Sequence, residues 1–172
     1  MAADTLYDED FVVWTERQAE ALRRAAKDGS NLPVDWENLA EEIESVGRSE
    51  RRQVRSLAEQ TIAHLLKLAH SPSVMTRVGW ESEIGLYRSL LQAALKDSPS
   101  LNPDVPDIVA EALPRARRNA GRSLRRYGEV SAADMVEHDS TAISADQVLD
   151  DEFFLPAPPF GWNEIAERER PR

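Results

Sequence analysis

Apolar residues recur at intervals of three and four along almost the whole chain, and this spacing limits the fold more than any other sequence feature. Such intervals are those of an α-helix, which turns once in about 3.6 residues. No stretch alternates apolar and polar residues with period two, as a half-buried strand would. The sequence therefore predicts an all-α fold.

Prolines, glycines and capping residues divide the pattern into segments. Asp8 is the expected N-cap of the first helix and Asp35 that of the second, which Gly47 is expected to end. Ser144 and Gln147 form a possible capping box before a short sixth helix. The loops are short, so we expect a compact bundle of five to six helices. The five main helices are expected over residues 8–28, 35–47, 49–70, 78–96 and 104–124.

The length of 172 residues suits one domain. We expect residues 1–156 to form a single helical domain. Residues 157–172 are rich in proline and charge, and we expect them to form a loosely ordered C-terminal tail.

Composition excludes several classes of protein. The chain has no cysteine, which excludes a disulfide scaffold, a thiolate metal site and a cysteine nucleophile. No apolar run approaches the roughly 20 residues of a membrane span, and the N-terminal segment is acidic where a secretory signal would be basic. No glycine-rich phosphate loop, HExxH, GxSxG or EF-hand pattern is present. We therefore expect an acidic cytoplasmic protein with no cofactor and no membrane contact.

The charge is segregated along the chain, which has a net charge of −10. Residues 51–128 hold 13 basic and 7 acidic side chains, whereas the segments on either side are each strongly acidic. The basic middle segment can be neutralised by the acidic ends, or it can leave a basic face free for an anionic partner. Four arginines recur on one side of the fifth expected helix and are the candidate anion- or partner-binding residues: Arg115, Arg118, Arg122 and Arg125.

Several short motifs resemble those of one family. Residues 35–44 read DWENLAEEIE and residues 64–67 read HLLK, and Trp80, Arg88, SPSL at 98–101 and LDDEF at 149–153 are similar to later signatures. Together they resemble the bacterial domain of unknown function 29 family over about residues 6–156. The resemblance implies an α-helical bacterial protein and carries no assigned activity. Residues 121–140 depart from the family pattern, which commonly has proline and cysteine there.

A carboxylate–imidazole cluster is the candidate metal site. If the second and third expected helices are antiparallel neighbours, Glu41 and Glu44 can meet His64, and such clusters bind a divalent metal or perform acid–base chemistry. Alternatively, His64 is a packed interface residue that a glutamate or a backbone carbonyl satisfies. The other motif residues are expected to be structural, with Arg88 a buried or half-buried ion-pair partner: Asp35, Trp36, Asn38, Glu42, Lys67 and Arg88.

Two functions from different classes remain open. The first is a macromolecular interaction protein, which fits the charge segregation and the lack of a catalytic signature. Its partner would be a protein, or a nucleic acid bound by the basic middle segment, and a homodimer is possible. The second is a metal-dependent hydrolase or nuclease that uses Glu41, Glu44 and His64.

Overall fold

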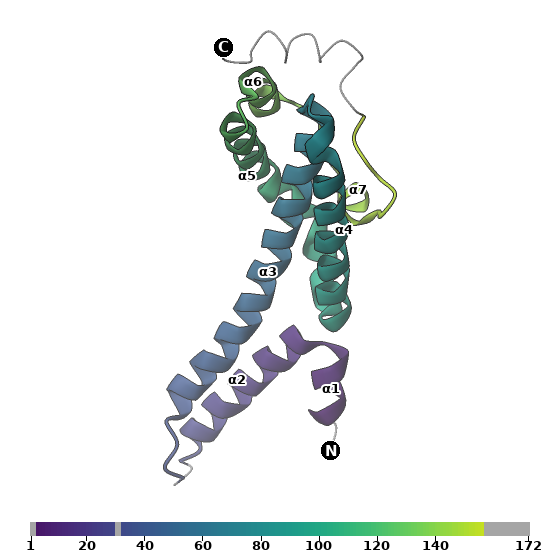
Figure 1. The fold of residues 1–172 in the computed structure, drawn as a ribbon. Helices are drawn as coiled ribbons and strands as arrows, with labels where there is room; N and C mark the ends of the chain where they lie inside the picture. The colour runs from purple at the N-terminus through teal and green to yellow at the C-terminus, as the bar shows by residue number, and fades with distance from the viewer. Residues whose placement is uncertain (1–2, 30–31, 157–172) are drawn as a thin grey trace. The chain divides into compact units, whose positions relative to one another are not determined.

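The computed structural model describes residues 3–29 and 32–156, and that part of the chain contains helices and no strands (Figure 1). The all-α prediction is confirmed. The tail predicted for residues 157–172 lies outside the described residues. In chain order the elements are α1 (Ala3–Glu9), α2 (Phe11–Lys27), α3 (Trp36–His70), α4 (Val74–Asp97), the 3-10 helix η1 (Pro99–Asp104), α5 (Val105–Arg126), α6 (Val130–His138) and α7 (Ala145–Leu149).

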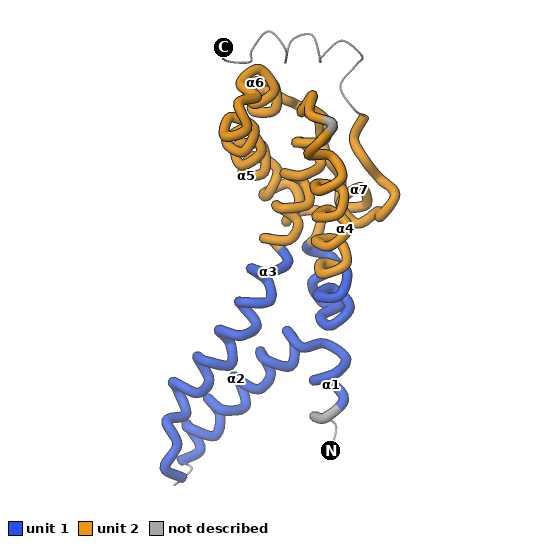
Figure 2. Tube along the Cα trace, in the orientation of Figure 1, with its two compact units in different colours: residues 1–54, 92–104 blue, residues 55–91, 105–172 orange. Residues whose placement is uncertain are grey.

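The helices group into two compact units (Figure 2). Unit 1 comprises residues 1–54 and 92–104, and unit 2 comprises residues 55–91 and 105–172. Helices α3 and α4 therefore each contribute residues to both units. That residues 1–156 form a single domain stays a prediction.

The second and third expected helices are one helix, α3, and the predicted break at Gly47 is wrong. Gly47 is buried inside α3, where a Cβ atom would clash with the Thr15 hydroxyl of α2. The glycine therefore serves the close approach of α2 to α3 and does not end a helix. The Thr15 hydroxyl donates a hydrogen bond to the carbonyl of Val12 at 2.7 Å, which holds it in this contact.

The buried side of α3 in unit 1 also differs from the predicted one. The helical spacing of Leu39 and Val46 predicts that both lie on the apolar stripe that faces the core. Both are exposed, whereas Ala40 and Gly47 are buried. Small residues seven positions apart lie on one side of a helix, so they form a shallow strip onto which α2 packs. The apolar stripe is therefore displaced from the closest contact.

The N-terminal helix is split in two, and its cap is Asp10 rather than Asp8. The Asp10 carboxylate accepts a hydrogen bond from the Val13 N–H at 3.0 Å, as an N-cap does. It also accepts the backbone N–H of Ser100 at 2.7 Å and the Ser100 hydroxyl at 3.0 Å. One carboxylate thus caps α2 and holds η1 in unit 1.

Unit 2 follows the predicted apolar pattern closely. Helix α5 buries apolar residues at helical spacing along its whole length and continues through Pro114. The predicted Ser144–Gln147 capping box is present at the start of α7. Helix α4 begins at Val74, four residues earlier than expected, and its Leu90 is exposed. The sequence pattern missed α6 altogether.

A buried arginine fastens the C-terminal part of unit 2 to α4. Arg88 is fully buried, and its guanidinium donates to the backbone carbonyls of Val148 at 3.0 Å, Gln147 at 3.0 Å, Asp151 at 3.3 Å and Phe153 at 2.8 Å. The predicted burial is correct. The principal partners are carbonyl groups rather than the carboxylate that an ion pair would supply.

Candidate functional site

Helix α5 carries the predicted arginine series, but the structure divides it. Arg125 is engaged by α6, because its guanidinium pairs with Asp134 at 2.7 Å and with Glu137. These ion pairs raise the pKa of Arg125 and lower that of Glu137. Arg125 therefore fastens α6 to α5 and is not available to a ligand.

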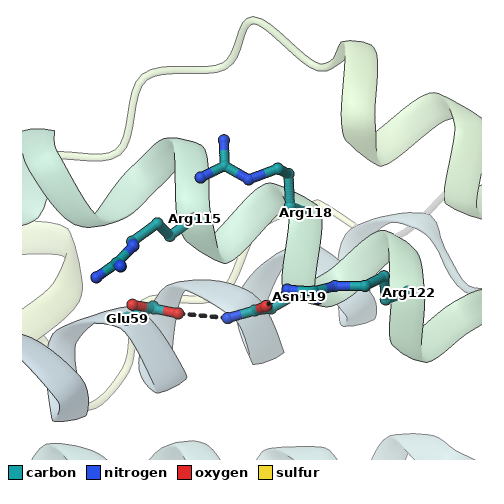
Figure 3. Close-up of a pocket in the computed structure, with 5 residues that line it drawn as sticks. All are labelled: Glu59, Arg115, Arg118, Asn119 and Arg122. Atoms are coloured by element: carbon teal, nitrogen blue, oxygen red, sulfur yellow. Dashed lines mark hydrogen bonds between the residues drawn. The ribbon is translucent and has the colours of Figure 1, made fainter.

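The other three arginines line a solvent-open hollow of about 480 Å³. Arg115, Arg118 and Arg122 recur at intervals of three and four, which places them on one side of α5. Asn119 lies between them and donates to the Glu59 carboxylate of α3, while its amide oxygen accepts from Arg122 (Figure 3). The hollow is therefore lined by a hydrogen-bonded pair, Glu59 and Asn119, and by three guanidinium groups.

Two of these guanidiniums are free. Within residues 3–29 and 32–156, neither Arg115 nor Arg118 has a hydrogen bond or an ion pair with another residue, and both are exposed. The hollow contains three guanidiniums against the single Glu59 carboxylate, so its local charge is positive in a chain of net charge −10. Guanidiniums bind carboxylate and phosphate groups with two parallel hydrogen bonds, so this arrangement suits an anionic group.

A second polar cluster lies between α3 and α4 in unit 2. His64 is buried, with Nδ1 2.8 Å from the carbonyl of Gln60 and Nε2 2.7 Å from a carboxylate oxygen of Glu83. Both partners are acceptors, whereas a neutral imidazole has only one N–H. This geometry therefore needs a second proton between His64 and Glu83. Burial, followed by the positive charge of Lys67, lowers the pKa of His64 and opposes that protonation.

Lys67 belongs to the same cluster. It is buried, and its ammonium lies 4.8 Å from the centre of the Trp80 ring, in a cation–π contact. Burial lowers the pKa of Lys67 to about 8, although the nearby Glu83 carboxylate acts in the opposite direction. The HLLK motif thus places an imidazole and an ammonium in a nearly dry helix interface.

The structure does not bring the predicted metal ligands together. Glu41, Glu44 and His64 all lie on α3, and the 20 residues from Glu44 to His64 correspond to about 30 Å along a helix. The geometry proposed from two antiparallel helices is therefore wrong. Glu44 instead forms a two-contact ion pair with Arg23 of α2, in which Arg23 Nη2 donates to Glu44 Oε2 at 3.0 Å. In the part of the chain that is described, no three His, Asp or Glu residues are close enough to hold a metal ion.

The other motif residues have local roles in the helices. The Asp35 carboxylate accepts from the Asn38 N–H at 3.3 Å and from the Asn38 side chain at 2.6 Å, so the pair caps the start of α3. Trp36 is half-buried and its indole N–H has no hydrogen-bond partner among the described residues, whereas Glu42 is exposed. None of these residues belongs to the lining of the arginine hollow.

Sequence reasoning missed several partners of the polar side chains. Glu83 and Tyr87 accompany His64, and Asp139 lies 2.9 Å from the ring of His70. Glu83 and Tyr87 are four residues apart on α4, so a helical projection of α4 against α3 was the signal available. Asp139 follows α6, the helix that the pattern did not reveal, so no such signal existed for it.

The profile of a family described as domain of unknown function DUF29 matches residues 6–154 of the chain. The chain belongs to the DUF29 family. A crystallised α-helical protein of unknown function from Rhodospirillum rubrum is similar to it at 26% identity with a TM-score of 0.67, over 96% of this chain and 98% of the other. No curated protein matches the sequence. Neither the DUF29 family nor the similar structure carries an assigned function.

Among the described residues, no helix combines the length and the apolarity that crossing a membrane requires.

Proposed function

We propose that this DUF29 protein is a binding protein that uses the arginine hollow of α5 to take an acidic segment of a partner protein. The observation that carries the proposal is the pair of free guanidiniums of Arg115 and Arg118, beside a third that is fixed by Asn119. Unpaired like charges held side by side repel one another, and a bound anion relieves that repulsion.

The charge of the rest of the chain favours a short acidic segment over a nucleic acid. A nucleic acid presents a long, regular row of phosphates, and proteins that bind one neutralise many of them at once. Outside residues 51–128 this chain is strongly acidic, so it would repel most of that row. A peptide segment that presents a few carboxylates meets only the hollow.

No metal or other cofactor belongs to this proposal. Three guanidiniums around one carboxylate repel a metal cation, and that carboxylate already accepts from Asn119. Binding would therefore be direct, through charge-assisted hydrogen bonds. We also infer the bacterial, cytoplasmic setting that the family motifs and the lack of cysteine suggest; subcellular fractionation of the source cells tests it.

Fluorescence anisotropy with a labelled glutamate-rich peptide tests the proposal, and a labelled DNA strand of equal charge is measured in parallel for comparison. We expect the Arg115→Glu/Arg118→Glu variant to bind the peptide at least about tenfold more weakly, since each charge-assisted hydrogen bond is worth about 1.5–3 kcal/mol. The matched control is Arg17→Glu/Arg52→Glu, which makes the same charge change at exposed residues of unit 1.

Two results would contradict the proposal. Equal loss of binding in both double variants would mean that net charge, and not the hollow, governs the interaction. Tighter binding of DNA than of the peptide at physiological salt would assign the hollow to nucleic acid instead. Circular dichroism of each variant checks that the helices remain intact, which we expect because all four residues are exposed.

A further inference from the structure

Helix α4 has an uncharged exposed face along its unit 2 segment. Thirty per cent of the chain is charged, yet none of the eight positions on this face is. All eight are exposed. We call these residues the α4 outer face: Met75, Val78, Gly79, Ser82, Gly85, Leu86, Ser89 and Leu90.

The opposite side of α4 is apolar as well, and it forms part of the core through Trp80, Ile84 and Leu91. A surface helix of a soluble protein normally opposes a polar face to its buried one. A helix that is apolar on both sides is typical of a position covered on both sides. Met75 is nevertheless 92% exposed and Val78 74%, so nothing in residues 3–29 and 32–156 covers the outer face.

We propose that a second copy of the chain covers the α4 outer face, so that the protein forms a two-fold symmetric dimer with antiparallel α4 helices. An isologous interface requires one patch that is complementary to itself. With the two-fold axis at Ser82, Met75 is level with Ser89 of the partner copy, and Gly79 is level with Gly85 of the partner copy. Val78 is likewise level with Leu86 of the partner copy. Glycine then faces glycine, which lets the two helices approach closely, and apolar side chains meet on either side of the glycines.

The glycines of this face support a close approach. Among the described residues, a Cβ atom at Gly79 or at Gly85 would meet nothing within 4 Å, so neither glycine is needed for packing against that part of the chain. A glycine inside a helix costs about 1 kcal/mol relative to alanine. Two such glycines on one exposed apolar face are explained by a neighbour that contacts their backbone.

The available area fits a weak but specific dimer. Met75, Val78, Leu86 and Leu90 expose 92%, 74%, 56% and 44% of their surface. Together with the intervening small residues they present roughly 500–600 Å² per copy, or about 1,000–1,200 Å² for two, which is the lower limit for a stable interface. We therefore expect a reversible dimer that dissociates in the micromolar range.

A lack of charge also separates this surface from the arginine hollow. An acidic or basic partner would find no opposite charge on the outer face, whereas a second copy supplies an uncharged surface of the same composition. The dimer thus rests on a different observation from the proposed anion binding, and either can fail without the other.

Sedimentation equilibrium of the full chain from about 1 μM to about 200 μM tests the dimer. We expect a monomer–dimer equilibrium for the native chain, and a monomer at every concentration for Leu86→Glu. The matched control, Leu32→Glu, introduces the same charge at another exposed leucine and should still dimerise. A monomeric native chain, or a dimer that Leu86→Glu leaves intact, would overturn the proposal.

The lack of cysteine in the chain permits a second test. Ser82→Cys places one thiol of each copy next to the two-fold axis, so oxidation should give a covalent dimer. The control Ser56→Cys places a thiol on an exposed position of α3, away from the outer face, and should give no covalent dimer under the same conditions. Equal cross-linking of both variants would overturn the antiparallel arrangement. The outer face could instead be protected by residues 157–172 of the same chain. The Ser82→Cys protein would then be a monomer whose thiol reacts only after those residues are removed, and this result would overturn the dimer itself.

Discussion

Replacing Arg88 with methionine should release the segment that follows α6 from α4. Methionine keeps most of the side-chain length and apolar volume, so the change removes chiefly the guanidinium. Four backbone carbonyls, of Gln147, Val148, Asp151 and Phe153, then lose their donor. The arginine also contacts the Phe154 ring, whose centre lies 5.5 Å from the guanidinium carbon.

The size of the effect follows from these bonds. A hydrogen bond to a charged donor contributes about 1.5–3 kcal/mol, so four would contribute about 6–12 kcal/mol if they were independent. They are not independent, because the segment can lift from α4 as a unit and regain hydrogen bonds with water. We therefore expect the free energy of unfolding to fall by about 3–5 kcal/mol, as when one partner of a buried charged contact is removed. The melting temperature should fall by about 10 °C.

Urea denaturation gives the change in the free energy of unfolding, and hydrogen exchange shows where it occurs. Amides of Gln147–Phe153 should exchange much faster in Arg88→Met, while those of the α2–α3 contact in unit 1 remain protected. Arg17→Met is the control, since Arg17 is exposed on α2, and it should change stability by less than about 0.5 kcal/mol. An Arg88→Met protein with native stability and native exchange would refute the argument that the guanidinium holds this segment.

Three further changes test other contacts. Gly47→Ala should destabilise unit 1 by about 1–3 kcal/mol through its clash with Thr15, and the Gly47→Ala/Thr15→Ala variant should recover part of that loss. Equal stabilities of Gly47→Ala and the native chain in urea would contradict the close approach of α2 to α3. Because the pKa of Lys67 falls to about 8 on folding, the native state binds fewer protons than the unfolded chain between about pH 8 and pH 10.5, and the free energy of unfolding should rise with pH over that range. In Lys67→Met this rise should be absent, and the free energy of unfolding at pH 7 should be higher by about 2 kcal/mol. A rise of equal size in the variant would exclude Lys67 as its source. Burial raises the pKa of Glu129, although the Ser71 hydroxyl lowers it, so the free energy of unfolding should decline as pH rises above about 4.5. Glu129→Gln should therefore be more stable than the native chain at pH 7 but not at pH 4. Equal melting temperatures of the variant and the native chain at pH 7 would contradict this.

Much of the fold could be predicted because helical periodicity survives in most segments. Helix α5 alternates its buried and exposed positions so regularly that even Pro114 does not obscure it. The break at Gly47 was predicted wrongly because glycine has two uses in helices, ending them and allowing close contact, and one sequence does not separate the two. Helix α6 was missed because nine residues give too few turns for a clear period.

The candidate site was predictable only in part. Spacing on one helix identified Arg115, Arg118 and Arg122, since residues of one helix keep fixed relative positions. It could not show that Arg125 is engaged, because its partners belong to the unrecognised α6. The metal site of Glu41, Glu44 and His64 was predicted wrongly for another reason: it required a break at Gly47, and the three residues lie on one continuous helix.

The contacts of Arg88 impose an order on the folding of the protein during its synthesis. The guanidinium on α4 is made about 60 residues before the carbonyls that satisfy it, at Gln147 to Phe153. During translation at about 5–20 residues per second, Arg88 therefore waits for several seconds with water as its partner. Helix α4 cannot bury this side chain without a large penalty before residue 153 has been made. A nascent chain should consequently keep this side of unit 2 open, and accessible to chaperones, until the loop that connects the two parts of the contact can close.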